Sequence, residues 1–462
     1  MLSVTLGTLL SIALTTLKMA LRAKYARRPL LTVAVVLGII LLGPACTISR
    51  SSEVDSRLTQ LQRHGVCSEL PLFGVSTHRG RNPDDTNTAL VSELGAQVVR
   101  IQIPWIEVEW NRKFAFGNFD HLVQGLRKKN RTLILVLAYG HPDHTNGGPE
   151  AGFPFAPRTA EQRDAYFNYL QAVVGHFHGP DIVYQIWNEP NIKAFWPLTP
   201  ADFDVLLKGA ATAILKVDPT ANILAAGIAN ERNRDLFVRG MTKAFGTKHV
   251  VNFAFHPYRQ DAPENSLVDI AAFENASGEA HQQRPVWLTE WGYSETWLSQ
   301  TYPFNNLRER QAIMTARLML TAAIAKAKVA LLYDLIDDGL NAKNPESKFG
   351  LYDYEFRPKK SALAFRKMTE LMSTCDTYRF AFDPIRKALT ATFASHEHIS
   401  RVIWTYNNRR GHTLCYKLDQ FKSTRLSDLT GHALPIETCS SPSTVKLKLR
   451  EDFGPLILTT DR

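Results

Sequence analysis

The sequence predicts an α/β fold in which a (β/α)₈ barrel, or TIM barrel, is followed by a small all-β domain. Three observations lead to this prediction. Short apolar segments alternate with amphipathic helical segments over residues 68–372, short alternating strands fill 376–462, and a basic and then apolar segment occupies 1–50. A chain of 462 residues exceeds one ordinary domain, so a large domain and a smaller one are expected.

The apolar segments of the predicted barrel are rich in Val, Ile and Leu, as strands buried on both faces of a sheet are. Eight such strands with intervening helices fit a closed barrel. A doubly wound open sheet is the main alternative, but no Gly-rich dinucleotide fingerprint follows the first strand. The expected strands are Leu72–Val75, Gln97–Ile101, Leu133–Leu137, Val183–Ile186, Ile223–Ala226, Val251–Phe255, Val286–Thr289 and Val329–Tyr333. Helices are expected over Asp164–Phe177, Asp202–Lys216 and Leu307–Lys326, among others.

The C-terminal region has a different pattern of apolar residues. Short alternating runs occur at Ala388–Phe393, Ser400–Tyr406, His412–Leu418 and Val445–Leu449, with turn residues between them. This pattern is typical of antiparallel strands. It predicts a sandwich-like accessory domain over 376–462.

The N-terminal segment, residues 1–50, has the order of a signal peptide or membrane anchor. Basic side chains at 22–28 precede an uncharged apolar run at 30–42, which meets Gly43-Pro44-Ala45-Cys46. The run is shorter than the roughly 20 residues of a spanning helix. Cleavage, lipidation at Cys46 and an uncleaved anchor remain alternatives. We therefore expect an exported bacterial protein, periplasmic, envelope-anchored or secreted, that meets the membrane only through this anchor or lipid.

The charge of the chain does not indicate a nucleic-acid partner. The formal net charge is +10, but the first 50 residues hold six basic side chains and no acidic one. The remainder has 48 basic and 44 acidic side chains, which is a mixed solvated surface.

The five cysteines permit disulfides. If Cys46 is lipidated or removed, the other four can form two bridges in three connectivities. Cys415–Cys439 is the favoured pair because both lie in the C-terminal region, and buried free thiols are the alternative. The cysteines lack metal-ligand spacing.

Two glutamates stand where predicted barrel strands end. The fourth strand closes with Glu189 in Trp187–Asn191, and the seventh closes with Glu290 in Leu288–Gly292. Because active sites of these barrels lie at the C-terminal strand ends, both carboxylates face one mouth. Around that mouth we expect Arg100 on strand 2, His141 after strand 3, and His256 and Tyr258 after strand 6.

A pair of carboxylates in one cleft is what glycosidic bond cleavage requires. One donates a proton to the leaving oxygen, and the other stays ionised. A separation of about 5–5.5 Å makes the second carboxylate a nucleophile, whereas about 6.5–9.5 Å leaves room for a water. Each charge opposes ionisation of the other, so the two pKa values separate. Pro190 is expected to hold Glu189 in an extended conformation.

The motifs Trp187-Asn188-Glu189-Pro190 and Thr289-Glu290-Trp291-Gly292 together resemble glycoside hydrolase clan A, whose members are retaining (β/α)₈ enzymes. The resemblance covers about residues 70–370. It implies that Glu189 is the acid/base and Glu290 the nucleophile. It also implies that Asn188 binds the sugar 2-hydroxyl, that Arg100 supports the nucleophile and that Tyr258 contacts it.

The region of the eighth strand, Tyr333–Gly339, with Phe349–Tyr352 and Arg357–Lys359, resembles family 5 and family 39 glycosidases. The resemblance implies a retaining hydrolase of O-glycosyl compounds that cleaves β-linked glycosides or polysaccharide, including envelope polysaccharide or exopolysaccharide. An oligo- or polysaccharide is then the expected partner. No metal or cofactor is implied, because the chemistry needs only carboxylates.

Less specific roles compete with these assignments. Arg100 could be a buried counter-charge, His256 a core histidine and His141 a loop residue, while Trp291 is expected either to form the floor of a sugar subsite or to pack in the barrel. Other mouth-side tryptophans are expected mainly to pack in loops, and three further acids to be solvated. These residues are Trp105, Trp110, Trp196, Trp297, Glu107, Glu109 and Glu295.

Two other classes of protein share the same features. A catalytically silent carbohydrate-binding envelope protein would keep the scaffold, but a silent relative usually loses one of the two glutamates. A structural envelope protein would use the barrel as a spacer.

Overall fold

The computed structural model of the chain describes residues 45–462, apart from 61–62, 79–83, 146–155, 246–250, 279–284, 302–305, 409, 419–422, 442 and 452. The predicted leader therefore lies almost wholly outside the described residues. None of the helices within the described ranges is long and apolar enough to cross a membrane.

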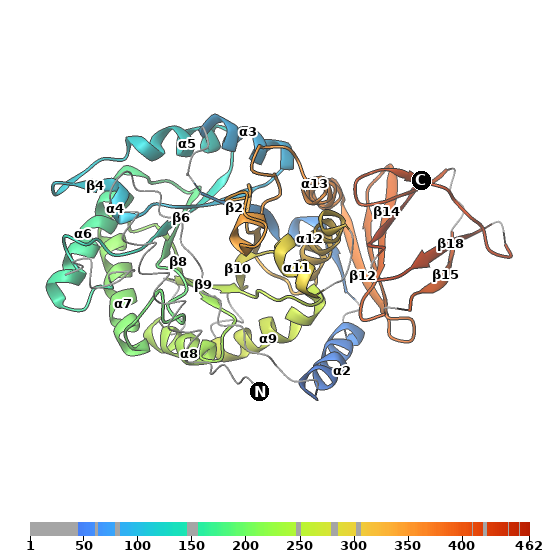
Figure 1. Cartoon of the computed structure of the whole chain (residues 1–462), viewed down its shortest axis with the longest axis horizontal. Helices are drawn as coiled ribbons and strands as arrows, with labels where there is room; N and C mark the ends of the chain where they lie inside the picture. The colour runs from blue at the N-terminus through green and yellow to red at the C-terminus, as the bar shows by residue number, and fades with distance from the viewer. Residues whose placement is uncertain are drawn as a thin grey trace, which may run out of the picture. The chain divides into compact units, whose positions relative to one another are not determined.

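Eight parallel strands form a closed barrel, which confirms the predicted fold class (Figure 1). Strand β11 pairs with β2 and closes the ring. Each strand overlaps one of the eight segments that the sequence predicts. In barrel order they are β2 (Leu72–Thr77), β3 (Val98–Gln102), β6 (Thr132–Leu137), β7 (Ile182–Ile186), β8 (Asn222–Ala229), β9 (Val251–His256), β10 (Trp287–Trp291) and β11 (Val329–Leu332).

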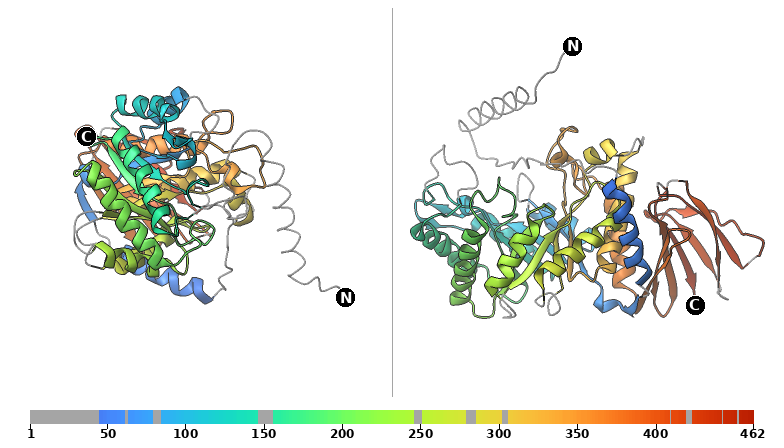
Figure 2. Two further views of the ribbon diagram at one scale, coloured as in Figure 1. Left: turned by 90° about the vertical axis from the view of Figure 1, so that its left-hand side faces the viewer. Right: turned by 90° about the horizontal axis from the view of Figure 1, so that it is seen from below.

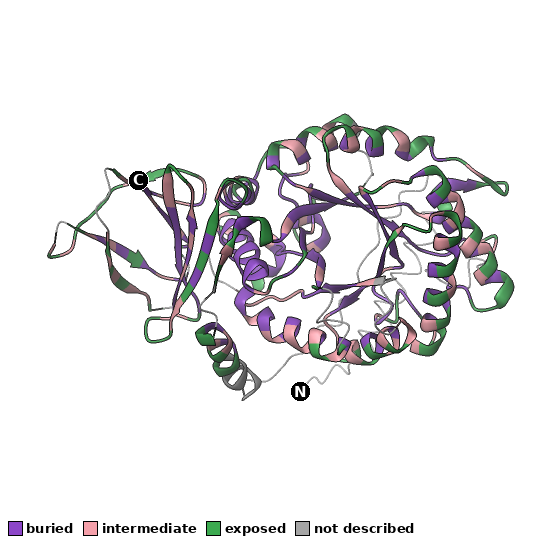
Figure 3. Cartoon of the chain, turned by 180° about the vertical axis from the view of Figure 1, so that it is seen from behind, coloured by how far each residue is buried: buried purple, intermediate pink, exposed green. Residues whose placement is uncertain are grey.

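Helices surround the barrel and turn their apolar faces towards it, so their outer faces are exposed (Figure 3). Two of them begin with a capping box, in which Thr159 and Gln162, or Thr199 and Asp202, satisfy each other's backbone N–H groups. The main helices are α3 (Asp84–Leu94), α5 (Gly117–Lys128), α6 (Ala160–His176), α7 (Pro200–Val217), α8 (Arg234–Phe245), α9 (Ser266–Ser277), α11 (Glu295–Thr301), α12 (Leu307–Ile324) and α13 (Lys360–Ser373).

The barrel interior is a packed core. Side chains from six of the strands form one buried cluster, as the inward-facing layers of such barrels do. The cluster consists of Val98, Ile134, Val183, Leu224, Ala254, Val329 and Leu331. Above this aliphatic layer, polar side chains such as Arg100 and Gln185 lie nearer the C-terminal ends of the strands.

The C-terminal region forms two antiparallel sheets that enclose a core of their own. The four strands expected there are present, as β13 (Ala388–Ala394), β14 (His398–Thr405), β15 (His412–Lys417) and β18 (Thr444–Leu449). The larger sheet also contains β12 (Thr377–Asp383), β16 (Thr424–Ser427), β17 (Ala433–Leu434) and β19 (Leu456–Asp461).

One edge strand of the larger sheet comes from ahead of the barrel. Strand β1 (Arg63–Val66) pairs antiparallel with β12. Its four residues lack an alternating apolar pattern, so the sequence did not predict it. The preceding helix α2 (Ala45–Gln60) contacts both β12 and α9 (Figure 2). The chain before the barrel therefore joins the barrel to the C-terminal sheets.

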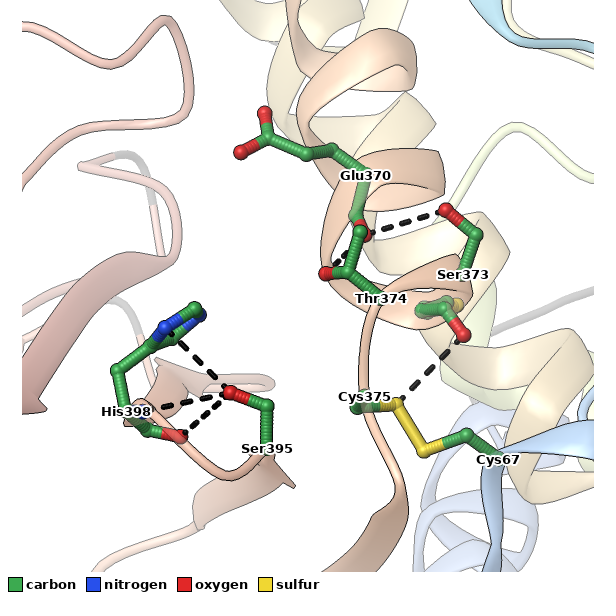
Figure 4. Close-up of a disulfide and its surroundings, with 8 residues drawn as sticks. Cys67, Glu370, Ser373, Thr374, Cys375, Ser395 and His398 are labelled. Atoms are coloured by element: carbon green, nitrogen blue, oxygen red, sulfur yellow. Dashed lines mark hydrogen bonds between the residues drawn. A yellow bond between two sulfur atoms is a disulfide. The ribbon is translucent and has the colours of Figure 1, made fainter. Parts of the chain in front are cut away.

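Two disulfides are present, and the favoured pair Cys415–Cys439 is confirmed. It links β15 to the segment before β18. The second bridge joins Cys67, just after β1, to Cys375, just after α13 (Figure 4). It spans 308 residues of sequence and ties the two ends of the barrel domain together. A bridge over so long a loop restricts the unfolded chain strongly.

A buried ion pair connects the barrel with the larger sheet. Both nitrogens of the Arg317 fork donate to Glu264, at 2.9 and 2.6 Å. Trp404 on β14 donates its indole N–H to the same carboxylate at 2.7 Å. Glu264 is fully buried, so one helix of the barrel domain and one strand of the larger sheet satisfy its charge away from water.

We predict that Glu264→Gln lowers the free energy of unfolding by about 3 kcal/mol, because the buried Arg317 loses the counter-charge to which it donates and keeps only the more distant Glu451, at 3.8 Å. Chemical denaturation measures the change. Glu370→Gln is the matched control, since Glu370 is exposed and pairs, within the described residues, with Lys367 on its own helix. Equal stability of the two variants would contradict the role of the buried pair.

Candidate active site

The predicted glutamates meet at the C-terminal rim of the barrel. Glu189 follows β7 and Glu290 lies on β10, and both are more than nine-tenths buried. One oxygen of each carboxylate and one ring nitrogen of His256 all lie within 4.8 Å of one another. The barrel therefore brings together side chains from three strands that are up to 101 residues apart in the sequence.

Arg100 organises one side of this pair. Its guanidinium donates to Glu290 Oε1 at 2.5 Å, to Asn188 Oδ1 at 2.7 Å and to Gln185 Oε1 at 3.0 Å. Gln185 in turn donates to the carbonyl of Trp187 at 3.0 Å. One buried cation thus orients the ionised carboxylate and the asparagine next to Glu189.

His256 lies between the two carboxylates and is fully buried. Its Nδ1 is 2.9 Å from Glu189 Oε1 and 3.6 Å from Glu290 Oε2, and its Nε2 is 3.0 Å from Thr289 Oγ1. Gly227 on β8 makes room for this ring, because a Cβ there would stand 2.0 Å from His256 Nε2. His256 is therefore part of the site and does not merely fill the core.

The backbone at Glu189 differs from the expectation. Glu189 has φ +45° and Trp187 has φ +67°, so both occupy the left-handed region and Glu189 is not extended. The Glu189 N–H donates to the Gly227 carbonyl at 2.9 Å. The Asn191 amide binds the backbone of Ala229 through both its oxygen and its nitrogen. These bonds to β8 outweigh the local preference before Pro190 and hold a strained turn.

Two tyrosines border the pair. Tyr258 donates its hydroxyl to Glu290 Oε2 at 3.3 Å. Asn188 donates its amide to the Tyr139 hydroxyl at 3.3 Å, and the Tyr139 ring stacks on Phe195. The sequence-predicted Tyr258 therefore meets the nucleophile candidate directly.

The surroundings separate the pKa values of the two carboxyls. Burial raises the pKa of Glu189, and the charge of Glu290 adds to that increase, while the hydrogen bond to His256 opposes it. Burial alone would also raise the pKa of Glu290. There the charges of His256 and Arg100, with the Arg100 hydrogen bond, outweigh burial and hold the pKa below its usual range. Near neutral pH, Glu189 is the group that keeps a proton more readily.

Two predicted binding residues do not join this cluster. His141 packs against Trp105 and His144, and burial lowers its pKa. Trp291 is fully buried, so its ring faces are not open to a sugar and it packs in the barrel instead. Both positions were expected from chain order, which does not reveal where a side chain points.

The further tryptophans and acids also differ in burial. Trp105, Trp196 and Trp297 are buried, whereas Trp110 is 79% exposed on a short hairpin. Glu107 is exposed. Glu109 is not solvated as expected, because it is buried between the Trp105 indole N–H at 2.6 Å and His144 Nε2 at 2.7 Å. Glu295 pairs with Lys359 at 2.9 Å, so it is not a free solvated acid either.

Two groups among the described residues have the donor atoms for a cation. One is Glu189, His256 and Glu290, but the Arg100 guanidinium already neutralises Glu290. The other is His78, Asp334 and Asp338 at the ends of β2 and β11.

Several site residues escaped the sequence prediction. Gln185 could have been found from the sequence. A side-chain amide within a fully buried strand costs free energy unless the amide has a hydrogen-bond partner. Gly227, Asn191, His78 and Tyr333 gave no such signal, because their partners lie on neighbouring strands.

Comparison with known proteins places the chain in a family of enzymes. The model of the cellulase family, glycosyl hydrolase family 5, matches residues 64–329. No curated protein sequence is similar enough to be counted as a relative.

Solved structures share the fold. A family 39 glycoside hydrolase from Bacteroides cellulosilyticus WH2 is 22% identical, with a TM-score of 0.68 over 86% of this chain and 82% of its own. A β-xylosidase from Caulobacter crescentus CB15 is 13% identical, with a TM-score of 0.60 over 87% and 98%. A family 5 enzyme from Streptomyces cattleya, in complex with GlcNAc, is 16% identical, with a TM-score of 0.52 over 66% and 81%.

We predict that Gly227→Ala displaces His256, because the added methyl group has no space. The free energy of unfolding should fall by about 1–3 kcal/mol. The pKa of Glu189 should rise further, since the hydrogen bond from His256 opposes the effect of burial. Denaturation and a ¹³C carboxyl NMR titration measure the two effects. Gly175→Ala is the control, as a Cβ there meets nothing within 4 Å. An unchanged Glu189 titration would contradict this role of Gly227.

Proposed function

The chain belongs to glycosyl hydrolase family 5 and is a glycosidase, and from this premise we propose that it cleaves β-linked glycosides with retention of configuration. Glu290 is the nucleophile and Glu189 the acid/base. The observation that carries the proposal is the buried pair whose oxygens lie within 4.8 Å of each other and whose pKa values shift in opposite directions.

The short separation supports double displacement. Retaining enzymes hold their carboxyl groups about 5–5.5 Å apart, whereas inverting enzymes need about 6.5–9.5 Å to fit a water between carboxylate and sugar. One oxygen of each carboxyl lies within 4.8 Å of the other, which favours direct attack by Glu290 on the anomeric carbon over attack by a water placed between them.

The reaction then has two steps. In the first, Glu189 gives its proton to the glycosidic oxygen, the bond between that oxygen and the anomeric carbon breaks, and Glu290 forms an ester with this carbon. In the second, Glu189 takes a proton from water, and the water oxygen displaces Glu290 from the carbon. The released sugar has its original configuration, and both carboxyls return to their starting states.

The neighbours of the pair have supporting roles in this scheme. Arg100 keeps Glu290 ionised and aligned through its contact at 2.5 Å. Asn188, fixed by Arg100 and Tyr139, offers its amide to the 2-hydroxyl of the sugar, where hydrogen bonds strengthen in the transition state. Tyr258 donates to the second oxygen of Glu290.

The substrate class follows from the same premise. We propose a β-linked oligo- or polysaccharide, including envelope polysaccharide or exopolysaccharide. The family model is that of cellulases, and one structural neighbour is a β-xylosidase. Both names support a β-linked sugar as the substrate.

We predict that 2-deoxy-2-fluoro glycosides with good leaving groups form a covalent ester on Glu290. The fluorine slows the second step, so the glycosyl-enzyme accumulates. Intact mass and peptide mapping detect it. Glu290→Gln should show no label, whereas Glu107→Gln, which changes an exposed acid of the same rim, should label as the wild type does. A label on another residue, or sugar cleavage that persists in Glu290→Gln, would refute the assignment.

We predict a bell-shaped dependence of kcat/KM on pH. Activity needs Glu290 ionised and Glu189 protonated. It is lost as pH falls through the lowered pKa of Glu290 and as pH rises through the raised pKa of Glu189.

The matching variant is Glu189→Gln. It should lose about 10²–10⁴-fold on glycosides with poor leaving groups and far less on dinitrophenyl glycosides, which need no protonation. Its alkaline limb should disappear on the dinitrophenyl substrate. An alkaline limb that survives in Glu189→Gln would assign the proton to another group.

A further inference from the structure

A second group of titratable side chains borders Glu290 on the side of the rim formed by β2 and β11. We call it the β11 wall, and it consists of His78, Tyr333, Asp334, Asp338 and Glu346. His78 follows β2, and three residues follow β11: Tyr333, Asp334 and Asp338. Glu346 lies on a short 3₁₀ turn (Pro345–Lys348). None of these residues has a role in the two steps described above.

The β11 wall has fewer hydrogen-bond donors than acceptors. The Tyr333 hydroxyl lies 3.1 Å from Glu346 Oε2 and 3.1 Å from His78 Nε2, and it also bonds to Asp338. A phenol carries one proton, so it can donate to only one of the two carboxyls, while His78 Nε2 donates or accepts according to its tautomer. The other acceptors need donors from elsewhere.

Asp334 illustrates this shortage of hydrogen-bond donors. Its side chain is 2% exposed, and its Oδ1 has no hydrogen-bond partner among the described residues. An oxygen of its carboxyl lies within 4.8 Å of a ring nitrogen of His78 and an oxygen of Asp338, so it belongs to the wall and not to a separate interior site. A buried carboxyl oxygen without a partner loses its hydration with no compensation. A ligand that brings donors would restore it.

The two nearby lysines donate to, or lie beside, carboxylates outside the wall. Lys359 donates to Asp337 at 2.8 Å and to Glu295 at 2.9 Å, and Lys348 lies 3.6 Å from Asp337. Burial raises the pKa of Glu346 to about 8, and the charges of Asp338, Glu290 and Glu189 add to the increase. The wall therefore contains many carboxyls and few cations. It is also close enough to the catalytic pair for the charges of Glu290 and Glu189 to affect the pKa of Glu346.

The wall also continues directly into the site. The rings of Tyr333 and Tyr258 are 6.5 Å apart in an edge-to-face arrangement, and Tyr258 donates to Glu290. Phe349 packs against both rings. A sugar whose anomeric carbon lies at Glu290 can therefore reach the wall with the hydroxyls on its far side.

We propose that the β11 wall recognises the glycone, the sugar that becomes bonded to Glu290, through donor groups of that sugar. The ligand class is a neutral or amino sugar whose hydroxyl or ammonium groups donate to Asp334, Asp338 and Glu346. A uronic acid is disfavoured, because its 6-carboxylate replaces a hydroxyl donor by a group that only accepts, and the unpaired oxygen of Asp334 needs a donor. This inference rests on the proposed function, since it uses Glu290 to place the sugar.

A divalent cation is the competing occupant, because His78, Asp334 and Asp338 could ligate one. The sugar is favoured by two observations. Glu346 and Tyr333 extend the shortage of donors beyond those three ligands, and the wall adjoins the nucleophile. The experiment includes the cation as an outcome that would overturn the proposal.

The test measures binding apart from catalysis. The full protein is titrated by calorimetry with methyl β-glycosides of glucose, galactose and mannose, and with the 6-carboxylate and aminodeoxy counterpart of each. At least one neutral or amino sugar should bind, and its uronate should bind at least about tenfold more weakly, which is the effect of one charge-assisted hydrogen bond.

Variants locate the effect in the wall. Asp334→Asn and Glu346→Gln should each weaken binding of the preferred sugar about tenfold and reduce the discrimination against its uronate. Glu355→Gln is the control, because Glu355 is exposed on the following loop and pairs with Arg357. Melting temperatures identify a variant that has lost its fold, and two independent wall variants keep the test decisive.

Three results would overturn the proposal. The first is a uronate that binds as tightly as its parent sugar. The second is a pair of folded wall variants that bind the sugar as the wild type does. The third is binding of Ca²⁺, Mn²⁺ or Zn²⁺ that is lost in Asp334→Asn, while no sugar of the panel binds. A failure of the proposed function differs from these. Sugars would then bind with the predicted preference, but no fluoro sugar would label Glu290.

Discussion

Closure of eight parallel strands is the constraint on which the rest of this molecule depends. Parallel strands end on the same rim, so every side chain that follows a strand is brought to one mouth while the interior below fills with aliphatic residues. Glu189 and Glu290 come from strands that do not adjoin in the barrel, since β8 and β9 lie between them. The polar side chains of the site are thereby brought together at that rim.

Within that cluster, the two carboxyls differ because their neighbours differ. Arg100 donates to Glu290 and to Asn188 but makes no hydrogen bond to Glu189, whose charge is opposed mainly by burial. The charges of His256 and Arg100, with the Arg100 hydrogen bond, therefore lower the pKa of one of two chemically identical side chains, while burial raises the pKa of the other. The strained turn at Glu189 serves the same end, since its bonds to β8 fix the carboxyl beside His256.

The segments outside the barrel stabilise it from one side. The strand ahead of the barrel completes the C-terminal sheet, the disulfide between Cys67 and Cys375 joins the two ends of the barrel domain, and Glu264 connects a barrel loop with Trp404. These contacts join the barrel domain to the C-terminal sheets, which have a packed core of their own.

The sequence by itself determined the eight strands, the positions of Glu189 and Glu290 at strand ends and the Cys415–Cys439 pair, because hydrophobic period and chain order are local properties. Tertiary structure alone decided the left-handed backbone of Glu189, the burial of Trp291 and Glu109, the place of His256 between the carboxylates and the shortage of donors around Asp334. The physical reason is that each of these depends on atoms of neighbouring strands. Gly227 is needed because the His256 ring lies against it. The sequence does not reveal which side chain packs against a glycine.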